Sequence, residues 1–355
     1  FTAISLLFHI IGFVMAQAEV AKYANEFLEI GVGARNLAMG KNGISTTSSA
    51  VALYWNPSLI SNNLTDIDIH FMHSIYLGGI ATYNYVGIAR KLDTARGIAF
   101  GFLRISVDNI PNTLEFMDKT GALHWDRISY FSVSDNALLA GYNTVIYGFN
   151  GGATLKLIYR QGGKWAKAYG FGFDLAISRK YNNTSIAIVL RDALTTPVLW
   201  TYSLDEQIKD VFIWTGNELP RQSVEISMPS LRLASSQRIL FHKDIIGNID
   251  GTITIYTDGM RNTIITGKPF SVDITAGAEL TYKEIIFIRA GIYNIQKEKA
   301  MFGGYSRLTS FFSGGIGLKL GRLSLDYALL NLAGNSPLPY SHVFSAAIDI
   351  IPRQN

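Results

Sequence analysis

Hydrophobic and polar residues alternate with a period of two along most of the chain after residue 65. The clearest case is FSVDITAGAELTY, residues 270–282, whose apolar side chains occupy every second position: Val272, Ile274, Ala276, Ala278 and Leu280. The segment YGFGFDLAIS, residues 169–178, has the same period. Because successive side chains of a β-strand point to opposite faces, the alternation predicts strands with one apolar and one polar face.

Roughly fourteen segments of this kind follow one another, many separated by only two or three residues. They lie near residues 66–77, 80–92, 95–107, 128–141, 144–160, 166–180, 183–192, 223–234, 249–258, 270–282, 284–295, 306–320, 322–332 and 340–350. Longer connections are predicted at 108–127, 194–222 and 259–269. Short turns at one end and long loops at the other are the layout of an outer-membrane barrel.

Segment length separates a membrane barrel from a soluble sandwich or barrel, which would bury its apolar face in a core. Many segments run for roughly 10 to 15 residues, whereas strands of globular sheets have about 5 to 6 and a tilted membrane strand needs about 9 to 11. Aromatic residues gather near the segment ends, as in an interfacial girdle. We therefore expect an all-β, antiparallel transmembrane β-barrel of about 14 strands over residues 65–351, with outer-membrane lipid against its outer face.

The first residues determine the expected compartment. Residues 4–15, ISLLFHIIGFVM, are a short apolar block, and the small residues AQA follow at 16–18. This is the pattern of a signal peptide over residues 1–18 with cleavage near Ala18. The alternative is a membrane-spanning helix, which needs about 20 apolar residues, and Gln17 and Glu19 follow too soon. The expected location is the outer membrane of a Gram-negative-type bacterium.

The composition argues against a disulfide-held fold and against nucleic-acid binding. Only 16% of the residues are charged, against about 25% in soluble domains, and there is no cysteine for a disulfide framework. The formal net charge is +4, and the basic residues form no run of five or more. Nucleic-acid binding is therefore not expected.

Residues 19–64 precede the first strand and lack the two-residue period. They contain ALYWNPSLIS, residues 52–61, in which Pro57 fixes its own φ angle and biases Asn56 toward extended backbone. Trp55 adds a large side chain with one hydrogen-bond donor. We expect Trp55, Asn56 and Pro57 to form a rigid corner. The simpler interpretation is a turn before the first strand, with Trp55 in the interfacial aromatic belt.

This segment resembles the N-terminal region of the PorV/PorQ family, a branch of the FadL-like outer-membrane barrels. The family motifs GARxxxMG and YWNPA match Gly33, Ala34, Arg35, Met39, Gly40, Tyr54, Trp55, Asn56 and Pro57. Ser58 replaces the usual alanine, and Ser48 and Ser49 stand where aspartates are common. The segments at 186–200, 274–292 and 313–350 are also similar to the family. The resemblance implies that residues 19–64 fold into the lumen as a hatch, shaped by the corner and by a glycine-rich segment: Gly31, Gly33, Arg35 and Gly40.

The resemblance implies two alternative functions, neither enzymatic. A PorV/PorQ-type accessory of the type IX secretion system would bind or shuttle secreted cargo at the cell surface, with a large translocon and cargo C-terminal domains as partners. A FadL-like transporter would instead carry a hydrophobic, fatty-acid-like ligand passively across the outer membrane. Four aromatic residues of the long 194–222 connection are candidates for contact with either ligand or cargo: Trp200, Tyr202, Phe212 and Trp214.

Other candidate chemistry is weak. GVGARN, residues 31–36, lacks the third glycine of a dinucleotide loop, and Ser341 and His342 are strand neighbours that point to opposite faces. Asp66, Asp68 and His70 share one strand face, but a spacing of nearly 7 Å is too wide for one metal ion. No metal or cofactor is expected. We interpret the charged residues of the polar strand faces as lumen residues: Asp66, Asp68, His70, Asp174, Asp273, Glu279, Arg289 and Asp326.

Overall fold

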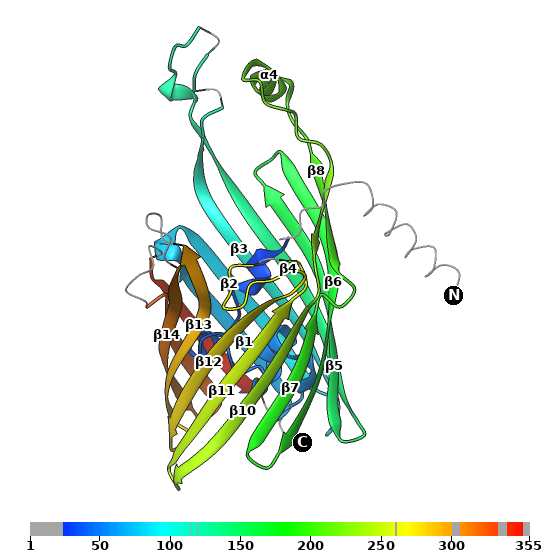
Figure 1. Cartoon of the computed structure of the whole chain (residues 1–355), viewed down its shortest axis with the longest axis vertical. Helices are drawn as coiled ribbons and strands as arrows, with labels where there is room; N and C mark the ends of the chain where they lie inside the picture. Colours follow the sequence, from blue (N-terminus) through cyan, green and yellow to red (C-terminus); the bar gives the residue numbers. More distant parts are fainter. Residues whose placement is uncertain are drawn as a thin grey trace, which may run out of the picture.

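The computed structural model describes residues 24–114, 116–118, 120–259, 261–299, 306–332 and 339–350. The predicted signal peptide lies outside these residues. The chain forms a closed antiparallel sheet of sixteen hydrogen-bonded strands (Figure 1). Their bounds are β1 Ile67–Tyr76, β2 Ala81–Lys91, β3 Gly97–Asn112, β4 Ser129–Ile146, β5 Phe149–Gly162, β6 Ala166–Tyr181, β7 Thr184–Arg191, β8 Thr196–Tyr202, β9 Ser223–Ser227, β10 Ser230–His242, β11 Ile245–Tyr256, β12 Ser271–Tyr282, β13 Ile286–Lys299, β14 Ser306–Leu320, β15 Leu323–Leu330 and β16 Ser341–Ile350.

The sixteen strands occupy fourteen strand positions around the barrel, as predicted. β6 pairs with β8 over residues 166–170 and with β7 over residues 175–181, so β7 and β8 are two parts of one interrupted barrel strand. β9 and β10 form the next barrel strand in the same way, since β9 pairs with β8 and β10 pairs with β7. Pairing of β1 with β16 and of β5 with β6 closes the barrel. β8 corrects the prediction that residues 194–222 are loop.

The two ends of the barrel differ as an outer-membrane barrel requires. The turns at 147–148, 182–183, 243–244 and 321–322 are short and lie at one end. The opposite end carries the β3–β4 connection, with the short helix η4 (Trp125–Arg127), and the β8–β9 connection, with helix α4 (Glu206–Trp214). Both project well beyond the barrel at the top of Figure 1. By the rule that long loops face outward, this end is extracellular.

The alternation along each strand has the predicted orientation. On β12 the side chain of Leu280 points outward and is exposed, whereas Thr275 and Glu279 point inward and are buried. On β6, Phe171, Leu175 and Ile177 are exposed and Asp174 is buried. The apolar faces therefore form the outer surface. No helix of the described residues has the length and apolar character needed to cross a membrane.

The segment before β1 lies inside the barrel, where its described part fills the middle of the lumen (Figure 1). It contains η1 (Glu26–Glu29), α2 (Ala34–Ala38), α3 (Ser49–Trp55) and η2 (Pro57–Leu59), and a further short helix, η3 (Leu77–Gly79), follows β1. Its apolar side chains form one buried cluster with inward residues of the wall. The predicted hatch is thus confirmed as part of the fold, and below we use "hatch" for residues 24–64.

The candidate functional site: the hatch and the lumen

The Trp-Asn-Pro corner joins α3 to η2 inside the hatch. Trp55 is buried, and its indole nitrogen donates a hydrogen bond to the Val32 carbonyl oxygen at 2.7 Å. The Asn56 side chain accepts from the Ser58 backbone nitrogen at 3.1 Å and donates to the Ile44 carbonyl oxygen at 2.9 Å. One asparagine side chain therefore caps η2 and holds a distant turn of the hatch. The simpler interpretation, with Trp55 in the interfacial belt, is wrong.

The glycine-rich segment has backbone that favours glycine. Gly31, Gly33 and Gly40 have φ angles of 106°, 84° and 67°, which other L-residues rarely adopt. The Gly40 backbone nitrogen donates to Ser313 Oγ on β14 at 3.0 Å. Between these glycines, Arg35 forms a two-bonded ion pair with Glu279 of β12, each bond 2.9 Å long. The segment is therefore fixed to the β12–β14 wall.

The half of the lumen wall formed by β2–β5 is mostly apolar where it meets the hatch, although Asn143 and Thr154 also bond to hatch residues. Its inward side chains are buried against the hatch: Tyr83, Tyr85, Leu103, Leu139 and Ile158. Leu53 of α3 lies so close that a Cβ added to Gly141 would be 2.5 Å from its Cδ1. Polar bonds here involve mostly the hatch backbone, as where Tyr85 donates to the Ala50 carbonyl oxygen at 2.6 Å. We call this surface the apolar half.

The opposite half, β10–β15, is polar and charged, and we call it the polar half. Glu279 bridges Arg35 of the hatch and Arg289 of β13, the latter at 2.7 Å. Arg289 also pairs with Asp326 of β15 at 2.6 Å. Glu279 and Arg289 are buried, Asp326 and Arg35 are partly buried, and the two positive and two negative charges neutralise one another. This arrangement is the pairing of lumen charges that the polar strand faces suggest.

Three inward glycines of the polar half form a seat for the hatch that sequence reasoning missed. A Cβ on Gly291 would lie 2.0 Å from the Gly40 backbone nitrogen, and one on Gly277 would lie 2.3 Å from the Met39 carbonyl oxygen. A Cβ on Gly315 would lie 2.6 Å from the side-chain Cβ of Ala38 in the hatch. The signal was available: at least one inward position is glycine on each of the consecutive strands β12, β13 and β14. Such a row indicates close approach of another backbone.

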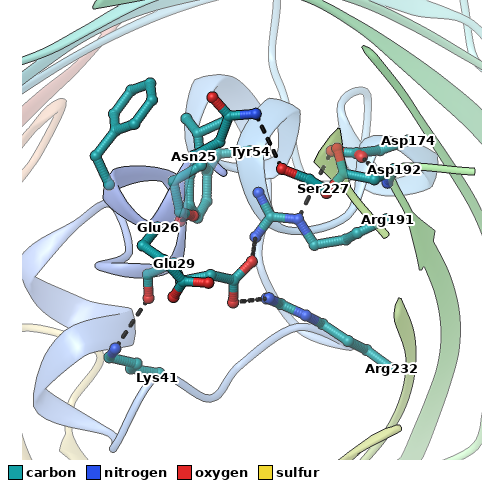
Figure 2. A network of polar contacts seen from close by, with 12 residues as sticks. Asn25, Glu26, Glu29, Lys41, Tyr54, Asp174, Arg191, Asp192, Ser227 and Arg232 are labelled. Atoms are coloured by element: carbon teal, nitrogen blue, oxygen red, sulfur yellow. Dashed lines mark hydrogen bonds and ion pairs between the residues drawn. The ribbon is translucent and has the colours of Figure 1, made fainter. Parts of the chain in front are cut away.

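A second ionic network holds the N-terminal part of the hatch (Figure 2). Glu29 accepts from Arg232 of β10 at 2.5 Å and lies 3.6 Å from a guanidinium nitrogen of Arg191 on β7. Arg191 is also 3.8 Å from Asp174. Burial of the Glu29 carboxyl raises its pKa, but the guanidinium groups of Arg232 and Arg191 outweigh this effect and lower the pKa to about 2. Glu29 is therefore ionised at neutral pH.

The same network continues to the break between β7 and β8. The Lys156 ammonium group, which is fully buried, lies 2.7 Å from Asp174 and 2.5 Å from Asp192. Asp192 is the first residue of the break and has a φ angle of 50°. Buried charges of this kind require partners, and here each has at least one. The break in the wall is therefore lined by charge on its inner side.

The remaining predicted lumen residues are placed as follows. Asp68 and His70 of β1 point inward, and Asp68 accepts a hydrogen bond from the Ala50 backbone nitrogen at 3.0 Å. Asp273 of β12 lines the outer of the two lumen cavities described below. Asp66 differs from the prediction: it precedes β1 and lies 4.0 Å from the outward-pointing Arg90, so it belongs to the rim. Within the described part of the chain, no group of three or more acidic, histidine or cysteine side chains is suited to a metal ion.

The four candidate aromatic residues lie at the extracellular end. Trp200 and Tyr202 of β8 stack with a ring separation of 6.3 Å, and Arg160 lies over the Trp200 ring at 5.0 Å. Phe212 and Trp214 belong to α4, in the projecting loop. None of the four lines the cavities described next. Their candidate contact with a ligand or with cargo stays a prediction.

Two polar cavities lie in the lumen on either side of the hatch. The outer one, of about 250 Å³, is bordered by the loop ends of the strands, including Tyr256, Asp273 and Tyr293. The inner one, of about 280 Å³, is bordered by periplasmic strand ends, including Lys180 and Lys319. A third hollow of about 1060 Å³ lies on the outer face of the barrel. Its outward side chains, such as Phe71 and Phe344, meet lipid.

No family model and no curated protein matches the sequence. Solved structures do match. The monoaromatic hydrocarbon channel CymD has a TM-score of 0.56 at 12% identity, over 92% of this chain and 99% of that one. The toluene transporter TbuX of Ralstonia pickettii has a TM-score of 0.57 at 12% identity, over 90% and 99%. For the toluene transporter TodX of Pseudomonas putida the values are 0.54, 12%, 93% and 98%.

At this level of identity the likeness concerns the fold alone, a barrel shared with CymD, TbuX and TodX. The chain therefore folds as a closed antiparallel β-barrel whose lumen is filled by its own N-terminal segment. The finer resemblance to the PorV/PorQ branch stays a prediction.

Proposed function

We propose that the protein is a passive outer-membrane conduit for small hydrophobic molecules, opened by movement of the hatch. The observation that carries this proposal is the apolar half of the lumen. If the hatch moves away from β2–β5, most of the side chains exposed to the lumen are aromatic and aliphatic, including Tyr85, Leu103 and Leu139. The polar exceptions on β4 and β5 include Asn143, Thr154 and Lys156. A hydrophobic ligand can then replace the hatch as the packing partner of this wall. The similar structures named for toluene and hydrocarbon transport support the same class of ligand.

A specific observation favours a second candidate, the accessory role in type IX secretion. The two projecting loops carry exposed apolar side chains near their tips, among them Trp125 on one loop and Ile213 and Trp214 on the other. Exposed apolar groups of this kind suit a protein partner at the cell surface. Such a role would not require hatch movement, and this difference separates the two candidates.

A disulfide lock tests the conduit. The chain has no cysteine, and the hydroxyl oxygens of Ser58 in the hatch and Ser178 on β6 are 2.7 Å apart. We expect the double variant Ser58→Cys/Ser178→Cys to form a disulfide that ties the hatch to the wall. In cells that express the oxidised variant, uptake of radiolabelled toluene or oleate should fall to the background of cells without the barrel. Reduction by dithiothreitol should restore uptake.

The matched control ties two wall strands together and leaves the hatch free. Thr82 on β2 and Ser106 on β3 face each other with hydroxyl oxygens 3.0 Å apart, so Thr82→Cys/Ser106→Cys offers a comparable disulfide. Uptake through this control should be insensitive to oxidation. Unchanged uptake by the hatch-locked variant, with its disulfide verified by mass spectrometry, would refute a conduit that depends on hatch movement.

A further inference from the structure

The outer lumen cavity has a composition that the hydrophobic conduit does not use. It lies above the hatch at the extracellular strand ends, and its volume of about 250 Å³ suits a small molecule. Hydroxyl and amide groups line it, including Thr254, Tyr256, Tyr293 and Asn331. These groups are far more numerous than a hydrocarbon requires, and they offer both hydrogen-bond donors and acceptors.

Two opposite charges of this cavity have no ion-pair partner among the described residues. The Lys41 ammonium group donates to the Glu29 carbonyl oxygen at 2.9 Å and lies 5.4 Å from the centre of the Tyr293 ring, but no carboxylate of the described residues lies within 4 Å. Among the described residues, the Asp273 carboxylate accepts only from the backbone nitrogen of its own neighbour, Ile274, at 2.9 Å. Other charges at the cavity are paired, as Arg232 is with Glu29.

A further polar atom at the cavity lacks a partner. Arg232 lines the cavity and is buried, with 5% of its surface exposed, and its Nε atom has no hydrogen-bond acceptor in the described part of the chain. A buried donor without an acceptor is costly, and it favours a ligand or water that supplies one. Lys41 also has a left-handed backbone, with a φ of 62°, directly after Gly40. Its ammonium group is therefore directed by a constrained turn of the hatch.

We propose that this cavity binds a small zwitterion, whose anionic group pairs with Lys41 and whose ammonium group pairs with Asp273. A molecule with only one charge would leave the opposite charge of the cavity without a partner. A hydrocarbon would leave both without partners and would also desolvate the surrounding hydroxyl groups. The site is separate from the apolar half, and binding to it is measured without transport.

The test is calorimetric titration of the full-length protein in detergent with the ω-amino acids glycine, β-alanine, γ-aminobutyrate and 6-aminohexanoate. One chain length should bind in a saturable manner, at least about tenfold more tightly than the carboxylic acid or the amine of the same length, because each comparison removes one charge-assisted contact. Absence of saturable binding throughout the series, or equal binding of the singly charged analogues, would overturn the proposal.

Two variants assign the groups. Lys41→Met should lower the affinity for the preferred amino acid about tenfold or more and abolish its advantage over the plain amine. Asp273→Asn, which keeps the side-chain shape, should abolish its advantage over the plain carboxylic acid. Lys319→Met removes a lysine from the inner cavity and should bind as the wild type does. Folding of each variant is checked by the difference in gel mobility between unheated and heated samples. If both site variants are folded and keep wild-type affinity, the zwitterion binds elsewhere and the proposal fails. Either failure leaves hydrophobic uptake unaffected, so it is distinct from failure of the conduit.

Discussion

The two halves of the lumen wall hold the same hatch with different chemistry. Against β2–β5 the hatch packs apolar side chains such as Leu53 onto Tyr85 and Leu103. Against β10–β15 it forms ion pairs and backbone contacts, as between Arg35 and Glu279 and at Gly291. Apolar packing has little directionality, and a ligand of similar polarity can replace it. Ion pairs between buried groups need one geometry, and no hydrophobic ligand can replace them.

This difference suggests how the hatch moves. A hydrophobic ligand that enters the lumen compensates for lost contacts only at the apolar half. The polar half, with Arg35–Glu279 and Glu29–Arg232, keeps its hold. We infer that the hatch opens on the apolar side and stays attached on the polar side. The experiments below test this inference by weakening one half at a time.

The largest effect should come from Glu279→Gln in the polar half. Glu279 is the shared partner of Arg35 and Arg289, so its neutralisation leaves two buried guanidinium groups short of a counter-charge. Loss of one partner from a buried ion pair costs about 3–5 kcal/mol. We expect a lower thermal midpoint in detergent and faster hydrogen exchange over residues 33–41.

A neighbouring glutamate supplies the control. Glu284 pairs with Arg238 at 3.6 Å, but its side chain is 72% exposed. Glu284→Gln should therefore change the thermal midpoint very little, because exposed pairs contribute about 0–1 kcal/mol. If Glu279→Gln behaves like this control, the ion pairs do not hold the hatch and the comparison between the two halves collapses.

A smaller effect is expected from Leu53→Ala in the apolar half. Leu53 is fully buried between α3 and the wall, and truncation of such a leucine costs about 2–5 kcal/mol, toward the lower end where neighbours relax. The cavity should admit apolar molecules, so uptake of radiolabelled toluene should rise while residues 33–41 keep their slow hydrogen exchange. Leu138→Ala, which removes a lipid-facing leucine beside Leu139, should alter neither property. Faster exchange over residues 33–41 in the Leu53 variant would show that the two halves do not act separately.

Sequence periodicity predicted the outer face of the barrel but only part of its lumen. The positions of Leu280 and Asp174 follow from a period of two, which the backbone imposes on every strand. The split between an apolar and a polar half does not follow, because an inward Leu103 is compatible with the pattern only when the hatch covers it. Nothing in the alternation indicates which strands the hatch will contact.

Long-range contacts explain the other differences. Asp66 continues the spacing of Asp68 and His70, but β1 begins one residue later, at Ile67, and leaves Asp66 at the rim. β8 was missed because residues 192–195 interrupt the barrel strand that β7 and β8 form. Its pairing with β6 is a long-range contact that local sequence does not indicate. The corner at Asn56 was recognised because Pro57 restricts its neighbour locally, but its bond to the Ile44 carbonyl joins residues twelve positions apart.

The smallest effect should come from acid, which weakens only the polar half. The pKa of Glu29 is about 2 in the folded protein and near its usual value of 4.5 when unfolded, so its contribution to stability is complete above pH 4.5 and is lost as the pH falls toward 2. Because the side chain keeps some contact with solvent, we expect a loss of only about 1 kcal/mol by pH 3.5. Hydrogen exchange measured from pH 6 to 3, corrected for intrinsic rates, should accelerate over residues 26–30 before residues 50–59. The variant Glu29→Gln should exchange rapidly over residues 26–30 at every pH. Equal acceleration of both segments in the wild type would mean that acid loosens the whole hatch, and attachment on the polar side would have to be abandoned.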